Sequence, residues 1–184
     1  MDARKTLIGE LREHALVIGE VTLTSGATAS YYVDAKRAIL RQPGFGALGE
    51  LVAAEAVRLG AAAVGGMTMG ADPIASAAIS DPAGRELLAF FVRKEKKAHG
   101  LQRWIEGPLL APGTRVLIVE DVVTTGGSTV KAIERCAEEE LVIAGTVSVL
   151  DRLAGGGAAI EAASGAPYVP LATIDDVHPG RDDR

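Results

Sequence analysis

The chain has 184 residues, of which 48% are hydrophobic and only 4% aromatic, and its formal net charge is −5. This length suits a single domain over 1–184, and a composition rich in Ala, Val and Gly favours helices layered on a parallel sheet over an all-β sandwich. The acidic balance argues against broad nucleic-acid binding, and no apolar stretch approaches the ~20 residues that span a bilayer. The only cysteine, Cys136, permits no intrachain disulfide, and with no secretory h-region at the amino terminus we expect a cytoplasmic protein.

The first predicted elements are a helix and a hairpin. Apolar residues recur at helical spacing from about Ala3, and this pattern predicts an amphipathic helix that ends near Gly19. Two short alternating segments, 21–24 and 31–33, flank a turn rich in Ser, Gly, Ala and Thr, which predicts a hairpin. We expect this hairpin to form a small cap outside the main sheet.

The middle of the chain alternates helical and strand-like segments, as a parallel sheet requires. After a helix at 45–59, a strand at 61–65 leads through a loop into a helix at 73–80. Asp72 is the expected N-cap of that helix and Pro73 its first residue. Further strands are predicted at 87–92, 115–119 and 144–150, and a flexible glycine turn at 155–157.

The most informative segment includes the predicted strand at 115–119. Residues 116–129 read Val-Leu-Ile-Val-Glu-Asp-Val-Val-Thr-Thr-Gly-Gly-Ser-Thr, so that an apolar strand is followed by Glu120 and Asp121. Ligands of open α/β sheets bind beyond the carboxyl ends of the strands, where this pair is expected to lie. Two carboxylates would repel a lone phosphate, whereas a phosphorylated ribose also offers them hydroxyl groups. The plainer alternative is a solvated acid pair at a strand-turn-helix junction.

The turn after the two acids is suited to holding a phosphate. Gly126 and Gly127 allow positive φ and close approach of a ligand, and the neighbouring Thr and Ser hydroxyls can donate hydrogen bonds. A helix is predicted over 130–140, and the first N–H groups of a helix have no intrahelical partner. The turn lacks the Gly-Lys-Ser/Thr ending of a nucleotide P-loop, which argues against an ordinary NTPase.

A second unusual segment is strongly basic. Residues 93–103 read Arg-Lys-Glu-Lys-Lys-Ala-His-Gly-Leu-Gln-Arg, and six of these eleven residues are Lys, Arg or His. A long loop inside a compact domain is often a functional lid, and a basic lid could neutralise negative charge that builds on a leaving group. The alternative is a solvated charged face.

Residues 116–129 resemble the phosphoribosyl pyrophosphate (PRPP) motif of the type I phosphoribosyltransferases. That motif reads apolar strand, Glu/Asp-Asp, two or three residues, then Thr-Gly-Gly/Ser, and the whole of it is matched. The resemblance implies that Glu120 and Asp121 contact the ribose hydroxyls and that 124–128 hold the 5-phosphate.

The basic segment is similar to the mobile catalytic loop of the orotate phosphoribosyltransferases, which reads Arg-Lys-x-x-Lys-x-His-Gly, at Arg93, Lys94, Lys97, His99 and Gly100. The resemblance implies that Lys97 and His99 donate to the leaving pyrophosphate and are catalytic, together with Asp121. The implied PRPP-binding set is Arg93, Lys94, Lys97, His99, Glu120, Asp121, Val122, Val123, Thr124, Thr125, Gly126, Gly127 and Ser128.

Two further segments resemble the same family. Residues 25–34 are similar to its Ser-Gly-x-x-Ser-x-Tyr-x-Asp signature, and Asp151-Arg152 resembles its orotate-contacting site. A guanidinium can meet the planar carboxylate of orotate bidentately, so Arg152 is an expected orotate contact, although it could instead form a surface ion pair with Asp151. Thr124 is the second expected orotate contact. The tyrosines at 31 and 32 either stack on the pyrimidine or pack within the hairpin.

The resemblance also implies an architecture and partners. The expected type I phosphoribosyltransferase fold is α/β, with a central mostly parallel sheet flanked by helices. A hood of about 1–40 plus the C-terminal segment would join a core of about 44–150 and a mobile loop of about 93–107. A homodimer with the loop donated across subunits is implied, and magnesium would be held mainly through substrate rather than by protein ligands. We expect no nucleic-acid or membrane partner.

The function implied by the resemblance is transfer of the phosphoribosyl group of PRPP to orotate, forming orotidine 5-monophosphate and pyrophosphate in de novo pyrimidine (UMP) biosynthesis. Two departures are Thr24 and Gly70, which stand where many family members carry lysines. The nearest rival is a transferase for another base, such as a purine or uracil. The rival from another class is a PRPP-sensing regulator that binds RNA, which should carry a basic face outside the ligand loop.

Overall fold

A computed structural model of the protein describes residues 2–22, 28–95 and 103–181. Its centre is a six-stranded sheet in which five neighbouring strands run parallel and a short edge strand runs antiparallel. The predicted α/β fold with a mostly parallel sheet is therefore confirmed. In sheet order the strands are β5 (Ile105–Glu106), β4 (Leu88–Val92), β3 (Ala63–Met67), β6 (Arg115–Val123), β7 (Val142–Asp151) and β8 (Tyr168–Thr173).

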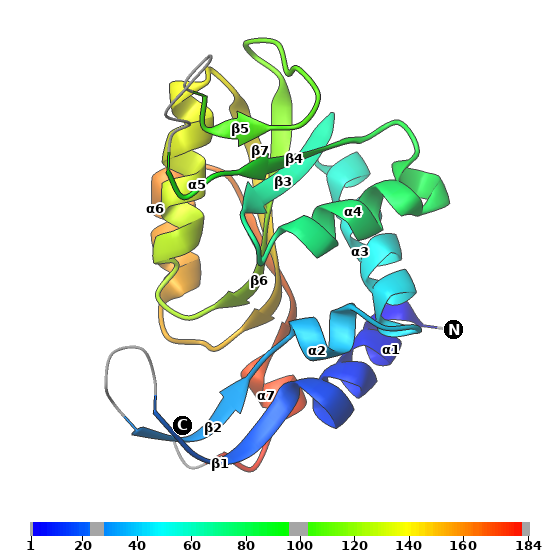
Figure 1. Ribbon diagram of the computed structural model, residues 1–184, viewed down its shortest axis with the longest axis vertical. Helices are drawn as coiled ribbons and strands as arrows, with labels where there is room; N and C mark the ends of the chain where they lie inside the picture. The colour runs from blue at the N-terminus through cyan, green and yellow to red at the C-terminus, as the bar shows by residue number, and fades with distance from the viewer. Residues whose placement is uncertain (1, 23–27, 96–102, 182–184) are drawn as a thin grey trace.

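Helices cover both faces of this sheet (Figure 1). One face carries α3 (Gly44–Arg58) and α4 (Asp72–Ser80), and the other carries α5 (Gly127–Glu138) and α6 (Gly156–Ser164). Leu117 and Val119 of β6 pack into the cluster on the α3 and α4 side, and Val116 and Ile118 into the cluster on the α5 and α6 side. A strand covered on both faces has to be apolar on both, which explains the continuous apolar run in the sequence.

A separate N-terminal layer lies beyond the carboxyl ends of the parallel strands (Figure 1). Arg4 ties the chain end to this layer, because its Nε donates to the Leu171 carbonyl at 2.9 Å and its Nη2 lies 3.2 Å from a carboxylate oxygen of Asp176. The layer consists of α1 (Ala3–Glu10), a π-helical turn (Leu11–Ala15), the antiparallel strands β1 (Leu16–Thr22) and β2 (Thr28–Val33), α2 (Lys36–Ile39) and α7 (Ile174–Val177).

The first helical segment is shorter than predicted. Helical geometry ends at Ala15 rather than near Gly19, because the chain becomes extended at Leu16 and pairs there with Val33. Ile18, an apolar residue within the span of the predicted helix, is 71% exposed on β1. The predicted hairpin strands are present and longer than expected, and the turn at 23–27 lies outside the described residues.

Several other boundaries differ from the predictions. Asp72 is the first residue of α4 rather than its N-cap, and its carboxylate accepts a hydrogen bond from the Thr68 hydroxyl at 2.6 Å. The glycine run at 155–157 starts α6, with Gly155 at φ 86° as the N-cap, so it is not a flexible turn. The elements α2, β5, β8, α6 and α7 were not predicted. Within the described ranges, no helix is both long enough and apolar enough to span a bilayer.

Candidate functional site

Glu120 and Asp121 lie inside β6 rather than beyond its end, because the strand continues to Val123. Neighbouring residues of a strand point to opposite faces, so the two carboxylates reach different layers. The hydroxyl of Thr129 on α5 donates to Glu120 Oε2 at 3.1 Å, whereas Lys36 Nζ on α2 lies 2.7 Å from Asp121 Oδ2. The acid pair therefore joins the sheet to a helix on one side and to the N-terminal layer on the other.

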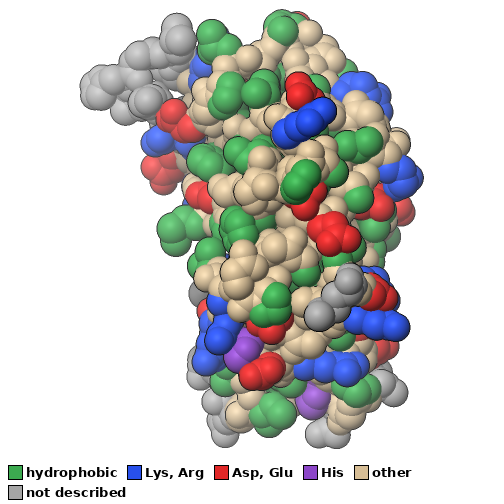
Figure 2. Space-filling model, turned by 90° about the vertical axis from the view of Figure 1, so that its right-hand side faces the viewer, with side chains coloured by type: hydrophobic (Ala, Val, Ile, Leu, Met, Phe, Trp, Pro, Cys, Tyr) green, Lys and Arg blue, Asp and Glu red, His purple; other side chains and the backbone are tan. Residues whose placement is uncertain are grey.

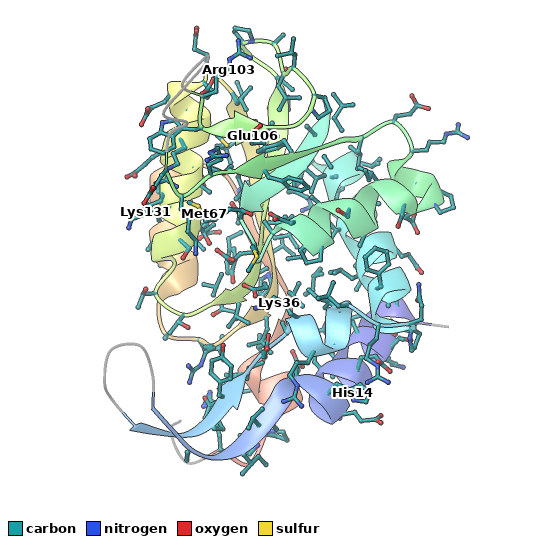
Figure 3. All side chains as sticks on the ribbon, viewed as in Figure 1. His14, Lys36, Met67, Arg103, Glu106 and Lys131 are labelled. Atoms are coloured by element: carbon teal, nitrogen blue, oxygen red, sulfur yellow. The ribbon has the colours of Figure 1, made fainter. Side chains whose placement is uncertain are left out.

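Lys36 is the main site residue that sequence reasoning missed. It begins α2 and lies between the N-terminal layer and the sheet (Figure 3), where its Nζ is also 3.2 Å from Asp34 Oδ1. Burial by itself lowers the pKa of a lysine, but the hydrogen bonds and charges of Asp121 and Asp34 outweigh burial and raise the pKa of Lys36 above its ordinary value. The only signal in the sequence is its place two residues after the signature that ends at Asp34.

A cavity of about 260 Å³ opens at the Lys36 ammonium. The loop between β3 and α4 forms one wall and the end of β6 forms another. Two ammonium groups and two carboxylates face this space, so it can hold an anionic group together with hydroxyls. We call it the acid-pair cavity, and its lining residues are Lys36, Met67, Thr68, Met69, Gly70, Lys94, Glu120, Asp121 and Ser128.

The absence of a side chain at Gly70 is a structural requirement of this cavity. A Cβ atom placed there would lie 2.7 Å from Asp121 Oδ1 and 3.0 Å from Glu120 Oε1. Any larger residue, including the lysine common at this place in the resembled family, would have to displace the acid pair. Lys36 and Lys94 bring ammonium groups to the same cavity instead.

Burial makes Glu120 an unusual carboxyl group. Glu120 is only 6% exposed, and this burial together with the adjacent Asp121 charge raises the pKa of Glu120 to about 8. Hydrogen bonds from the Thr129 hydroxyl and the Asp121 backbone N–H oppose that rise only in part. Burial and the Asp121 charge therefore favour the protonated form of Glu120 more than in an ordinary carboxyl group, and this reduces the negative charge of the pair.

A second cavity, of about 350 Å³, lies over the turn between β6 and α5. Gly126 is the N-cap of α5 with φ 79°, in the left-handed region that favours glycine, whereas Gly127, for which positive φ was also predicted, is the first residue of the helix. The helix thus starts at 127, earlier than the predicted 130, and directs its unpaired N–H groups at this space. We call it the loop cavity, and its lining residues are Glu120, Val122, Val123, Thr124, Thr125, Gly126, Gly127, Ser128, Thr129 and Lys131.

The predicted residues of the turn are placed unequally. Thr124, Thr125 and Ser128 are exposed and offer hydroxyls to the loop cavity, whereas the side chain of Val123 is only 1% exposed and packs in the core. Glu120 and Ser128 line both cavities. One ligand can therefore place a phosphate at the start of α5, run its hydroxyls past the acid pair and leave a second anionic group near Lys36.

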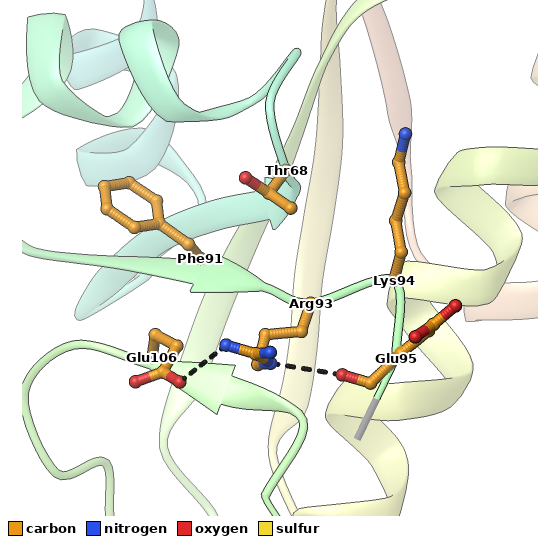
Figure 4. A pocket seen from close by; sticks show the side chains of 6 residues that line it. All are labelled: Thr68, Phe91, Arg93, Lys94, Glu95 and Glu106. Atoms are coloured by element: carbon orange, nitrogen blue, oxygen red, sulfur yellow. Dashed lines mark hydrogen bonds and ion pairs between the residues drawn. The ribbon is translucent and has the colours of Figure 1, made fainter. Parts of the chain in front are cut away.

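The start of the basic segment borders a third cavity, of about 370 Å³ (Figure 4). Arg93 Nη1 lies 3.1 Å from Glu106 Oε1 on β5, so the guanidinium points toward that strand, and Arg93 does not line the acid-pair cavity. Lys94 lines both this cavity and the acid-pair cavity. The predicted residues Lys97, His99 and Gly100 lie outside the described residues, as do Ser25 and Gly26 of the amino-terminal signature and Thr24 before it.

Arg152 lies where β7 ends and faces the N-terminal layer. Its guanidinium carbon is 5.1 Å from the centroid of the Tyr31 ring, and His178 packs edge-on against the same ring at 5.2 Å. Tyr31 is 2% exposed and so packs in the hairpin core, while Tyr32 is 41% exposed and available for stacking. Asp151 accepts a hydrogen bond from the Leu153 N–H at 2.8 Å. Arg152 is thus supported on an aromatic ring above the strand ends.

Other chemistry is limited in the described part of the chain. No group of three or more His, Cys, Asp and Glu side chains there could hold a metal ion. Cys136 is buried in α5, and burial raises the pKa of its thiol to about 12, so it acts neither as a ligand nor as a nucleophile at neutral pH. On the face in Figure 2, Lys and Arg side chains are interspersed with Asp and Glu and form no broad basic surface.

Comparison with known proteins gives a consistent result. Residues 55–164 match the model of the phosphoribosyl transferase domain. The orotate phosphoribosyltransferase of Streptomyces avermitilis is 45% identical over 169 residues, which are 91% of this chain and 92% of that protein. A structure of Mycobacterium tuberculosis H37Rv orotate phosphoribosyltransferase superposes with a TM-score of 0.84 at 41% identity, covering 96% of this chain and 99% of that one. Another structure of the mycobacterial protein, in complex with PRPP, has a TM-score of 0.78 at 35% identity, covering 95% of this chain and 98% of that one.

Proposed function

The chain belongs to the orotate phosphoribosyltransferase family, and we propose that it transfers the phosphoribosyl group of PRPP to N1 of orotate, forming orotidine 5-monophosphate and pyrophosphate in pyrimidine biosynthesis. The observation that supports this function most strongly is that Glu120 and Ser128 line both the loop cavity and the acid-pair cavity. The two cavities together match a ligand with a phosphate at one end, a ribose in the middle and a pyrophosphate at the other.

The 5-phosphate of PRPP occupies the loop cavity in this proposal. The N–H groups at the start of α5 and the hydroxyls of Thr124, Thr125 and Ser128 donate to its oxygens, with Gly126 and Gly127 allowing the close approach. Asp121 and Glu120 then accept from the ribose hydroxyls. Because burial and the Asp121 charge raise the pKa of Glu120, the negative charge of the acid pair is reduced, which limits its repulsion of the phosphates.

The pyrophosphate leaves into the acid-pair cavity. Breaking its bond to the anomeric carbon leaves an oxocarbenium-like ribose and puts negative charge on the leaving group. Lys36 and Lys94 are within the cavity that receives this charge, and Lys97 and His99 complete the set as the proposed donors to the leaving oxygens. Asp121 is the third proposed catalytic residue, because its carboxylate stabilises the positive charge that develops on the ribose.

Orotate binds on the side of the N-terminal layer. Arg152 is the proposed contact for the orotate carboxylate, since a guanidinium held over the Tyr31 ring can offer two parallel N–H donors. Thr124 follows the last residue of β6, next to the end of β7 where Arg152 lies, and is the second proposed orotate contact. A base without a carboxylate would leave the Arg152 charge without its partner, which favours orotate over uracil.

Magnesium is the proposed cofactor, and the residues present suit it. Mg²⁺ is usually held by one or two carboxylates plus substrate phosphates and water, and the acid pair supplies such carboxylates at the wall of the cavity. The ion would be held by PRPP oxygens and water beside Asp121, and when bound it would neutralise charge on the pyrophosphate. The Lys36 ammonium, 2.7 Å from Asp121 Oδ2, meanwhile holds the Asp121 side chain in place.

The proposed function is tested by the base that the enzyme accepts. Purified protein is incubated with PRPP, magnesium and orotate, and the loss of orotate ultraviolet absorbance is followed beside parallel reactions with uracil, hypoxanthine and xanthine. Loss with orotate alone is the expected result. Product from another base and none from orotate would retain the PRPP site but contradict the acceptor assignment. Binding of pyrimidine-operon leader RNA without any transfer would instead identify a regulator.

A further inference from the structure

Arg135 on α5 makes three close contacts with the segment that contains the proposed pyrophosphate donors. Its Nη1 donates to the Arg93 carbonyl at 2.6 Å, and its Nη2 donates to the Lys94 carbonyl at 2.8 Å. Its guanidinium carbon also lies 4.2 Å from the centroid of the Trp104 ring. Arg135 lines none of the three cavities described above. Its Nη1 also donates to Met67 Sδ at 3.2 Å, and Met67 lines the acid-pair cavity. Arg135 therefore contacts residues that form the wall of that cavity without facing the cavity itself.

Trp104 is held from the same helix. Its backbone N–H donates to the Glu139 carboxylate at 2.9 Å, and its Nε1 donates to Glu138 Oε2 at 2.6 Å. The Arg93 N–H in turn donates to the Trp104 carbonyl at 2.9 Å, so the residue that follows β4 and the residue that precedes β5 are joined directly. One end of α5 thus secures the chain on both sides of the basic segment.

This arrangement controls the direction of two proposed site residues. A hydrogen bond from a charged donor is stronger than a neutral one, and two such bonds fix the orientation of successive peptide groups. With both carbonyls held, the Arg93 side chain reaches Glu106, while the Lys94 side chain extends away from Glu106 (Figure 4) and lines the acid-pair cavity. The other end of α5 lines the loop cavity. One helix therefore sets the position of the loop cavity and the direction of the Lys94 side chain.

We propose that Arg135 is a positioning residue for phosphoribosyl transfer, which orients Lys94 toward the pyrophosphate of PRPP by holding the carbonyls of Arg93 and Lys94. The inference rests on the proposed function and adds a residue to it. Arg135 touches no substrate and acts through the backbone that it binds. Losing it affects the pyrophosphate end of PRPP and leaves the orotate contacts at Arg152 in place.

The test compares Arg135→Gln with Arg135→Lys. Arg135→Gln removes the charge, the paired donors and the cation-π contact, and we expect the KM for PRPP to rise by about tenfold or more while the KM for orotate stays within about twofold. Arg135→Lys keeps a charge that can reach one carbonyl and the Trp104 ring, so it should restore part of the loss. Arg58→Gln on α3 is the matched control, because it removes an arginine paired with Glu55 at 2.7 Å and remote from the cavities.

A double-mutant comparison with Lys94→Ala separates positioning from a general structural role. If Arg135 acts through Lys94, adding Arg135→Gln to Lys94→Ala should raise the KM for PRPP by less than about twofold further. The full effect persisting in that background, or wild-type kinetics for Arg135→Gln, would overturn the proposal. Should Arg135→Gln not fold, Trp104→Phe, which keeps the ring but loses the Nε1 donor, must raise the KM for PRPP selectively. These variants are compared only after the wild-type enzyme has been shown to convert orotate. Failure of the proposed function would appear in the wild type, whereas failure of this inference would appear only in the variants.

Discussion

At the scale of single residues, the site depends on Lys36, which links the N-terminal layer to the acid pair. Replacing Lys36 with Met removes the ammonium near the proposed pyrophosphate position and leaves Asp121 without its 2.7 Å partner. We expect kcat/KM for PRPP to fall by about tenfold to a hundredfold. Lys5→Met is the matched control, since Lys5 is exposed on α1 and its Nζ makes only a long ion pair, of 3.9 Å, with Asp2. Equal kinetics for the two variants would remove Lys36 from the site.

Glu120 gives a prediction for the pH dependence of stability. Its pKa is raised from about 4.5 to about 8 in the folded protein, so between these values the folded state binds more protons than the unfolded state. Stability from this group is therefore fully present below about pH 4.5 and is lost as the pH rises through about 8. Glutamine cannot lose a proton in this range. As the pH rises from 6 to 9, the thermal unfolding midpoint should therefore fall less for Glu120→Gln than for the wild type. Parallel curves for the two proteins would contradict the raised pKa.

The sequence predicted one half of the site better than the other. Glu120, Asp121 and the turn at 124–128 lie within one short stretch of the chain, so the local pattern of strand, acids and glycines was enough to bring them together. Lys36 meets Asp121 across 85 positions of the chain, and no local pattern encodes that contact. Arg135 was missed because it reads as an ordinary charged residue on an amphipathic helix, although its partners are backbone carbonyls.

At the scale of elements, the start of α5 is shaped by Gly126. Alanine there would have to adopt φ 79°, and its Cβ would lie 2.8 Å from the Gly156 carbonyl oxygen. At Gly113, where φ is 81°, no other atom lies within 4 Å of the place that a Cβ would take, so this residue provides a control for the cost of positive φ alone.

We expect Gly113→Ala to lower the free energy of unfolding by about 1 kcal/mol and Gly126→Ala by clearly more, with loss of PRPP binding only in the second. Urea denaturation and PRPP titration of both variants measure the two effects. If Gly126→Ala were no less stable than Gly113→Ala, the contact between the α5 and α6 starts would not constrain the loop cavity.

The elements that were missed depend on contacts with distant parts of the chain and not on local sequence. The glycine run at 155–157 predicted a turn, yet it starts a helix in which Ile160 is fully buried and packs against the α5 side of the sheet. Strand β5 has two residues and is defined only by its pairing with β4. The strands β3, β4, β6 and β7 were recognised because they carry mainly apolar or small residues on both faces.

At the scale of the whole molecule, the homodimer implied by the family resemblance would place Lys97 and His99 of one subunit in the site of the other, whereas Lys94 lines the cavity of its own chain. Mixing Lys97→Ala with Asp121→Ala after denaturation and refolding tests this arrangement. If each site takes its loop from the partner subunit, half of the randomly formed dimers contain one intact site, and about a quarter of wild-type activity should return. Activity no greater than that of the separate variants would show that each subunit supplies its own loop.

The central claim is that the loop cavity and the acid-pair cavity form one PRPP site across Glu120 and Ser128. A crystal structure of the wild-type protein with PRPP and magnesium tests it most directly. The account predicts the 5-phosphate at the N–H groups that start α5, the ribose hydroxyls at Asp121 and the pyrophosphate beside Lys36 and Lys94. PRPP bound with its 5-phosphate in the acid-pair cavity, or outside both cavities, would contradict the account.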